Sequence, residues 1–595
     1  MLAEHSLIDL ATRRARLAEK QIALIESGAM PGPVIAIGST GTNSATARLL
    51  SAIAHAPQGA VVLPGLDRDL DEEAWRHIAR HVDDGHDSAF GHPQAALARL
   101  LPALKIARDV VVELSQLDGQ RAARGRLVSE ALRPAETTDH WAAYRISVSP
   151  DDLAMALQDV AFVEAADERE EALALAIAMR ELLEEPEKTA ALVTPDRALA
   201  RRVASELRRF GIAVEDSAGE PLSASAYGIL AKLVATCGAN GLAGEDIVAL
   251  LAHPLACLGA SRTEIERVAP LFEIAVLRQP RALTRFASAQ EAVAWARREI
   301  NTTRAHPAQK RIEEDGEWAA IERLTAQLME TLAPLSSLHG SHGLAKWIEA
   351  HRDALDRATK SEEPLALDQD HEILDALFDE LARCAPADLP FSNETYLAFF
   401  SNTAAATALK TRKTTHPRLK ILGLLEARLI DADLILLGGL DETIWPPEAR
   451  SDAFLNRPMR AALGLTPPER KIGQTAHDFM MAMGAPRVVL SRAQKRDGSP
   501  MVASRFIQRL SAVADDTFTE CRARGARYLA LVQALDRPPT PAKTARPMPR
   551  PALDLRPKGL SVTRIETLRR DPYAIYAEFI LSLIELPTLA APLDR

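Results

Sequence analysis

The stretch HPRLKILGLLEARLIDADLILLGGLDETIWPPEARSDAFLNRPMRAALGL, residues 416–465, decides the fold. It contains two short apolar runs, residues 419–425 and 434–437, and both are predicted to be buried strands because polar or glycine residues bound them. The second run is followed by a Gly-Gly pair and then by the polar group Asp441, Glu442 and Thr443. Ligands bind beyond the carboxyl ends of strands in an open α/β sheet. The stretch therefore predicts the ligand-binding edge of a parallel sheet.

The rest of the chain extends this α/β pattern on both sides. Apolar runs at residues 34–37 and 60–63 predict two strands near the N-terminus. Residues 160–240 alternate strand and helix, with strands at 160–163 and 189–193, helix 168–183, and a second helix that Thr194 caps and Gly211 ends. Residues 241–409 are almost wholly helical in pattern. The sequence predicts an α/β protein whose second sheet is interrupted by a large helical insertion.

Composition restricts the class of protein. A chain of 595 residues with 47% hydrophobic and 26% charged residues is long enough for several globular domains. It has no run of about 18 apolar residues and no signal peptide, and its four scattered cysteines form no CxxC pair, so we expect a cytoplasmic protein with free thiols. The net charge of −10 excludes a generally basic nucleic-acid coat but permits a local basic track.

The segment GSTGTNSATARLL after the first predicted strand has the order strand, glycine turn, helix, which cradles phosphate in many proteins. A Walker A loop needs Gly-Lys-Ser/Thr, whereas Asn43 and Ser44 follow Thr42, and no lysine occurs between Lys20 and Lys105. We therefore expect no ATP site here. The segment is interpreted as a Ser/Thr-rich turn that caps a helix starting near Ala45.

Two further patterns resemble metal-binding motifs, but the sequence argues against both as metal sites. His77 and His81 lie four residues apart, but Ile78 stands where a zinc protease needs glutamate, and no third ligand is placed. Asp452 with Glu469 and Lys471 matches a loose nuclease motif, but flanking prolines argue against the strand that this motif requires. No catalytic, cofactor-binding or metal-binding residue is assigned.

Two basic tracks are the candidate DNA contacts. Five positive residues between 410 and 420 have no acid between Ser401 and Leu425, which suits a phosphate backbone or, equally, a solvated loop. A second track follows the strand predicted at 488–490. Because both adjoin strands of one sheet, we expect them at one rim. The candidate residues are Lys410, Arg412, Lys413, Arg418, Lys420, Arg492, Lys495, Arg496 and Arg505.

A Pro-rich basic linker, predicted at residues 516–558, is the competing source of DNA affinity. Seven prolines fall between Arg537 and Pro557, and residues 522–570 contain twelve Lys/Arg against three Asp/Glu.

Several of these stretches together resemble the AddB family, the second subunits of the AddAB helicase–nucleases of bacterial double-strand break repair. The resemblance is carried by EAR at 426–428, GGLDETIWP at 438–446, residues 38–101, LLAHPLACLG at 250–259, residues 477–494 and LSVTRIETLRRDPYAIYAEFIL at 560–581. It implies superfamily-1 helicase-like parallel-sheet cores: residues 1–159 in the first, and 160–240 and 410–515 in the second. The helical insertion is then 241–409, and 559–595 begins a truncated nuclease-like domain.

The resemblance also implies a function. It predicts a DNA-binding, non-motor subunit that holds duplex ends and a single strand, paired with an AddA-type subunit in a complex that uses ATP and Mg²⁺. The ATP-loop region and most of the nuclease are then outside this chain, and Asp571 replaces the cysteine with which some members bind an iron–sulfur cluster. Arg492 resembles a nucleotide sensor of motor proteins, but MMAM replaces the Gln/Glu-rich helix expected before it. The alternatives are a self-sufficient superfamily-1 helicase and an α/β scaffold that does not act on DNA.

Overall fold

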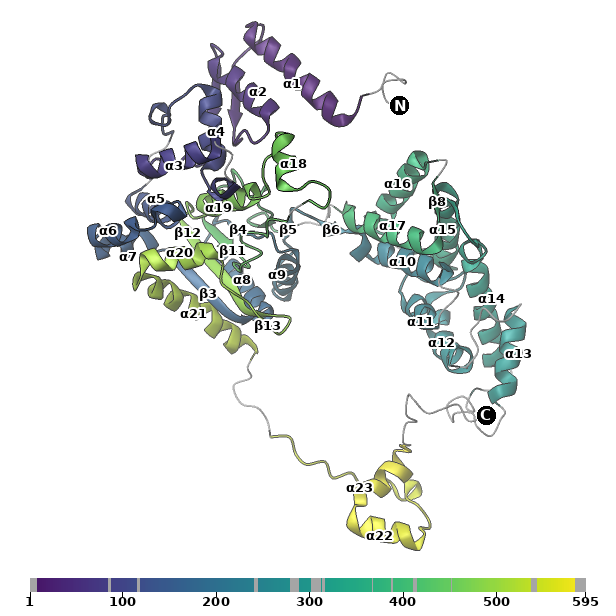
Figure 1. Ribbon diagram of the computed structural model, residues 1–595. Helices are drawn as coiled ribbons and strands as arrows, with labels where there is room; N and C mark the ends of the chain where they lie inside the picture. Colours follow the sequence, from purple (N-terminus) through teal and green to yellow (C-terminus); the bar gives the residue numbers. More distant parts are fainter. Residues whose placement is uncertain are drawn as a thin grey trace. The chain divides into compact units, whose positions relative to one another are not determined.

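The computed structural model describes residues 8–83, 87–114, 118–239, 244–278, 288–300, 312, 316–365, 367–386, 389–409, 415–450, 452–536 and 543–583. It divides into two compact units, Met1–Gln533 and Ala534–Arg595. The first unit holds an N-terminal α/β part, a larger parallel sheet and a helical part (Figure 1).

The larger sheet consists, within the described residues, of six parallel strands in the order β3-β12-β11-β4-β10-β5. A short antiparallel strand, β13 (Ser499–Pro500), pairs with the end of β12. The parallel strands are β3 (Val160–Asp167), β4 (Ala190–Val193), β5 (Glu215–Asp216), β10 (Leu419–Leu422), β11 (Leu434–Leu437) and β12 (Arg487–Arg496).

Helices cover both faces of this sheet, which explains why its strands are almost continuously apolar. Successive residues of a strand point to opposite faces: Ala190 and Leu192 join one hydrophobic core, and Ala191 and Val193 join the other. Helices α8 (Glu168–Leu182) and α9 (Arg197–Arg209) cover the first face. The second face packs against α5 (Gly119–Ala131), α7 (Pro150–Leu157), α19 (Arg470–Ala482) and α20 (Arg505–Ala514).

The N-terminal part is built around a parallel pair of strands, β1 (Val34–Ile37) and β2 (Gly59–Val62). Leu50, Leu97 and Leu100 pack on one another beside these strands, and a separate small core surrounds Trp75. The remaining elements are α1 (Leu10–Glu26), α2 (Ser44–His55), α3 (Glu72–Asp83), η2 (Asp87–Gly91), α4 (Ala95–Leu104), η3 (Arg108–Val110), η4 (Ala135–Thr137) and α6 (His140–Ser147).

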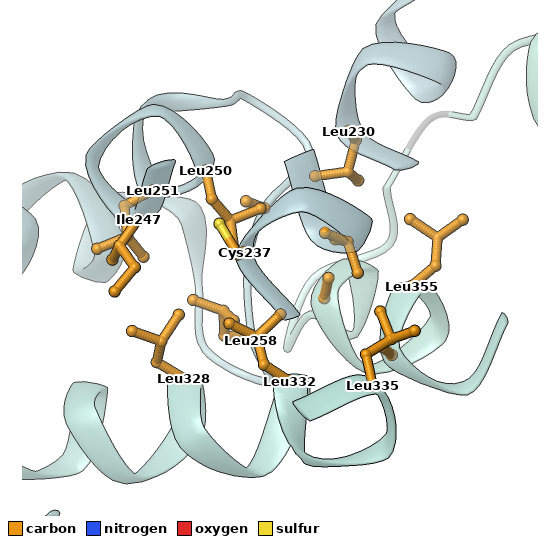
Figure 2. Packing of buried hydrophobic residues seen from close by; sticks show 14 of the residues in the cluster. Leu230, Cys237, Ile247, Leu250, Leu251, Leu258, Leu328, Leu332, Leu335 and Leu355 are labelled. Carbon is orange, nitrogen blue, oxygen red and sulfur yellow. The ribbon is translucent and has the colours of Figure 1, made fainter. Parts of the chain in front are cut away.

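The helical part lies in the sequence between β5 and β10. It begins about 20 residues before the predicted limit of residue 241, because the helix at residues 226–239 packs in its core. Its core combines aliphatic with aromatic side chains, among them Trp347 and Tyr396, and Cys237 lies among leucines inside it (Figure 2). Short strands β6 (Glu220–Pro221) and β9 (Ala408–Leu409) pair antiparallel at its two ends, and β7 (His342–Gly343) pairs with β8 (Pro390–Phe391) within it. The helices are α10 (Ala226–Ala239), α11 (Gly244–Ala252), α12 (Arg262–Phe272), α13 (Ala289–Ile300), α14 (Gly316–Ser336), α15 (Leu344–Thr359), α16 (Gln369–Cys384) and α17 (Asn393–Ala406).

The structure confirms the α/β class with a parallel sheet, and it corrects three local predictions. Asp196, not Thr194, caps α9, because its carboxylate accepts from the amides of Ala198 and Leu199. Strand β10 ends three residues earlier than its apolar run. The predicted linker is wrong at its start, because helix α21 (Thr517–Asp536) occupies those residues and buries Phe518 and Cys521 against the sheet.

The smaller unit contains two short helices, α22 (Val562–Arg570) and α23 (Pro572–Ile575), followed by the π-helical turn η10 (Tyr576–Ile580). Asp571 caps α23 by accepting from the amides of Tyr573 and Ala574. No helix in the described part of the chain is long and apolar enough to cross a membrane.

Candidate functional site

The carboxyl edge of the larger sheet brings together charged side chains from five segments. Asp441 follows β11 through Gly439, whose φ of +74° sets the turn, and the side chain is fully buried. Arg492 and Arg496 project from β12. The other members are Glu164 on β3, Glu171 on α8 and Asp196 at the cap of α9. This is the edge that the sequence predicted as ligand-binding.

Arg492 is held completely by protein groups. Its Nε donates to Asp441 Oδ1 at 3.0 Å, its Nη1 to Glu164 Oε1 at 2.8 Å and its Nη2 to the carbonyl oxygen of Met501 at 2.7 Å. The residue is 5% exposed. Its guanidinium therefore ties β3, β11 and β12 together and is not presented to solvent.

Arg496 and Glu171 complete the cluster. Arg496 pairs with Asp196, and its Nη2 lies 3.7 Å from Asp441 Oδ2. Glu171 Oε1 accepts from the Gly439 amide at 2.8 Å and from Ser491 Oγ at 2.7 Å. Among the described residues, Glu171 Oε2, Asp441 Oδ2 and the Nε and Nη2 of Arg496 make no hydrogen bond.

Burial controls the protonation of the two central carboxyls. Desolvation raises the pKa of Glu171 to about 7, although its hydrogen bonds from Ser491 and Gly439 oppose the rise. Desolvation also raises the pKa of Asp441, against the attraction of Arg492. The cluster holds two arginines against four carboxyls, so a proton on Glu171 relieves an excess of negative charge. This edge is suited to binding a proton, and its arginines are not available to an anion.

The predicted DNA-contact residues fall into three groups. Lys410, Arg412 and Lys413 lie outside the described residues. Four arginines are engaged by protein: Arg492 and Arg496 as above, Arg505 donates to Glu442, and Arg418 donates to the carbonyls of Leu183, Glu185 and Lys188. Lys420 is half-buried and Lys495 is exposed.

The structure also corrects the expectation of one shared rim. Arg418 immediately precedes β10, so it lies at the amino edge of the sheet. Lys495 and Arg496 end β12, which runs parallel to β10, so they lie at the carboxyl edge. The sequence could not show this, because a basic track beside a strand can precede it or follow it.

Glu171 is the functional candidate that the sequence reasoning missed. It occurs in the run EREE at the start of α8, where acids normally serve the helix dipole in water. The sequence did contain a signal that Glu171 is buried. It lies four residues before Leu175, on the apolar stripe with which α8 packs against the core.

The rejected metal patterns have structural roles in the described residues. His77 lies 3.4 Å from Glu136, whereas the side chain of His81 is outside the described set. Glu469 immediately precedes α19 and pairs with Arg457, and Lys471 lies in that helix, so neither is on a strand. No group of three or more His, Cys, Asp or Glu side chains in the described ranges could hold a metal ion.

The turn after β1 also differs in detail from its predicted form. Asn43, not a serine or threonine, caps α2 by accepting from the Ala45 amide at 2.8 Å. Gly38 and Gly41 both have positive φ, of +78° and +61°. The loop is thus a defined turn.

The chain was compared with protein families and with curated proteins. No protein-family model matches the chain, and no curated protein matches it.

Proposed function

We propose that this chain is the DNA-binding, non-motor subunit of an AddAB-type ATP-dependent helicase–nuclease that processes double-strand DNA ends for recombinational repair. One observation carries the proposal: the parallel sheet is interrupted between β5 and β10 by a helical part, and this is the insertion that the AddB resemblance implies. An AddA-type partner would supply ATP-driven translocation. The ATP and Mg²⁺ of the complex would bind outside this chain.

The non-motor role rests on the turn after β1. The segment GSTGTNS contains no lysine to neutralise the β- and γ-phosphates of a nucleotide. Arg492, which resembles a nucleotide sensor, spends all three of its donor groups on Asp441, Glu164 and Met501. A chain of this kind supports binding of DNA rather than its translocation.

DNA binding by an acidic protein requires local positive charge. Within the described residues, Lys495 is exposed and has no ion pair. Arg418, Arg492 and Arg496 instead form hydrogen bonds or ion pairs with other groups of the protein. The pair Arg412 and Lys413 therefore remains the main candidate in the first track. The linker cations Arg537, Lys543, Arg546, Arg550, Arg556 and Lys558 are the competing source.

The salt dependence of DNA affinity tests the proposal. A phosphate contact contributes about 0.9 to the slope of log K against log salt for duplex DNA, or about 0.7 for a single strand. Arg412→Ala with Lys413→Ala should weaken binding to all sequences alike and flatten this slope by about 1.4 to 1.8. Arg201→Ala with Arg208→Ala removes the same charge from the exposed side of α9 and is the matched control.

The linker is tested by changing its six cations to glutamine in the full chain. Deletion from residue 512 onward is unsuitable, because it would remove α21 and its packing against the sheet. If the glutamine variant loses DNA binding while the Arg412/Lys413 variant binds normally, the residues that bind DNA lie in the linker. Absence of any DNA binding by the full chain would refute the proposed function.

A further inference from the structure

A small hollow lies between the N-terminal part and the helix α19 of the larger sheet. Its volume is about 40 Å³, and the turn after β1, the start of α4 and the start of α19 form its walls. The lining side chains that matter to the argument are Thr40, Thr42, Arg99, Arg470 and His477.

The turn after β1 packs closely against α4. A Cβ atom at Gly41 would lie 2.5 Å from Leu100 Cδ1, and the φ of +61° at this position also favours glycine. The turn leads directly into the amino end of α2, a helix of 12 residues. The hollow is therefore bordered by threonines of the turn, whereas the first residues of α2 are not part of its lining.

Two arginines without acidic partners meet at this hollow. Within the described residues, Arg99 is exposed and makes no hydrogen bond or ion pair, and Arg470 makes a single hydrogen bond, to the carbonyl oxygen of Thr42 at 3.4 Å. A third arginine, Arg428, also lines the hollow but is neutralised by Asp478, at 2.7 and 3.0 Å. Two uncompensated guanidinium groups, 371 positions apart in the sequence, thus converge in a protein whose net charge is −10.

A buried side chain in the wall of the hollow is incompletely bonded. His477 is 3% exposed, and its Nε2 donates to the carbonyl oxygen of Pro64 at 3.0 Å. Its Nδ1 has no hydrogen-bond partner in the described residues. Asp478 Oδ1 lies 3.9 Å from this nitrogen, beyond hydrogen-bond distance, so among the described residues the buried atom lacks the partner that such atoms normally have.

We propose that this hollow binds one phosphate group of a nucleic-acid strand. Arg99 and Arg470 would contact the phosphate oxygens, and the threonine hydroxyls would donate to them. The contact therefore reads the backbone and carries no sequence information.

The neighbouring surface favours a strand over a free nucleotide. A larger groove of about 1020 Å³ shares Gly41, Thr42 and Arg99 with the hollow. Lys105 also lines it, together with Glu26 and an ion pair of Arg48 with Glu19 at 3.4 Å. A polymer can place successive phosphates along such a groove. The strand form of this inference rests on the proposed function, whereas the phosphate site itself does not.

The first test compares the full chain with Arg99→Gln/Arg470→Gln on a labelled oligothymidylate. Losing two single-strand contacts should weaken binding about 25-fold at 0.1 M salt and reduce the salt slope by about 1.4. Arg201→Gln/Arg208→Gln is the control of equal charge. Circular dichroism should show an unchanged fold, because neither hollow arginine has an acidic partner in the described residues.

A neutral backbone identifies the group that is recognised. Replacing phosphates of the oligothymidylate by methylphosphonates should weaken binding to the unmodified protein, and the double variant should respond less. Unchanged affinity and slope in the double variant, beside normal binding by the control, would overturn the inference.

Calorimetry with inorganic pyrophosphate and with ATP separates this inference from the proposed function. If the chain binds no DNA but binds pyrophosphate or ATP through Arg99 and Arg470, the proposed function and the strand assignment fail and a nucleotide-phosphate site replaces them. If the chain binds neither DNA nor these anions, both proposals are overturned. If it binds DNA while the double variant matches the control, the proposed function survives and this site falls.

Discussion

Replacing Glu171 by glutamine should remove a pH dependence that is built into the larger sheet. Glu171 has a folded-state pKa of about 7, against 4.5 for an ordinary glutamate, because burial disfavours its charge. The folded state therefore holds a proton that the unfolded state releases between these two values. Stability is full below pH 4.5 and falls as the pH rises through 7.

The size of the effect follows from the two pKa values. A shift of about 2.5 units corresponds to about 3 kcal/mol once the pH is well above 7. Between pH 5 and pH 8 the loss is about 2.5 kcal/mol, or about 70-fold in the opening equilibrium. In Glu171→Gln this loss should vanish, since the amide oxygen can still accept from Gly439 and Ser491 while the side chain stays neutral.

Hydrogen exchange of peptides from β11 and β12, read by mass spectrometry and corrected for intrinsic rates, measures this opening directly. The unmodified chain should lose protection from pH 5 to pH 8, and Glu171→Gln should not. Glu184→Gln, at a side chain 68% exposed just beyond the end of α8, is the control and should follow the unmodified chain. Parallel pH profiles for the unmodified chain and Glu171→Gln would refute the reasoning.

Three further outcomes are expected. Gly525→Ala should destabilise the protein by about 3 kcal/mol or more in urea unfolding, because its Cβ would lie 1.9 Å from the carbonyl oxygen of Phe162, while Gly119→Ala in open space should change stability by less than about 1 kcal/mol. Arg124→Met should cost about 3 kcal/mol by leaving the carbonyls of Ala156 and Ala485 without their buried donor, and wild-type stability would contradict this. The isolated chain should hydrolyse no ATP on single-stranded DNA, and turnover abolished by Arg492→Ala would show that the missing lysine was misjudged.

The sequence was most informative where a short apolar run has clear boundaries. Strands β1 and β11 have the predicted bounds, and the helical part ends at its predicted limit of residue 409 but begins about 20 residues before the predicted 241. Their boundaries are local: glycines, prolines and charges end each pattern within one or two residues. The same rule failed for α21, because the prolines of the linker begin only after Asp536 and no breaker marks the preceding helix.

The candidate site was harder to predict because it depends on strand order. Arg492 looked like a free cation beside a strand, but β12 lies between β3 and β11, and these neighbours supply Glu164 and Asp441. Which strand pairs with which is not encoded in any one segment. The hollow beside Arg99 and Arg470 has the same character, since its walls come from segments that only the tertiary fold brings together.

The antiparallel pairing of β6 with β9 has a consequence for how the chain folds. Strands β4 and β10 lie side by side, with Ala190 opposite Leu419, yet the whole helical part separates them in the sequence. When Glu220 pairs with Leu409, the ends of that part are clamped together and about 190 residues drop out of the loop that the sheet must close. Shortening the effective loop between Ala190 and Leu419 from about 230 residues to about 40 lowers the entropic cost of closure by about 1.6 kcal/mol. The helical part is rich in local contacts and can therefore fold early. Once folded, it holds the two halves of the sheet close together, so that their strands can pair.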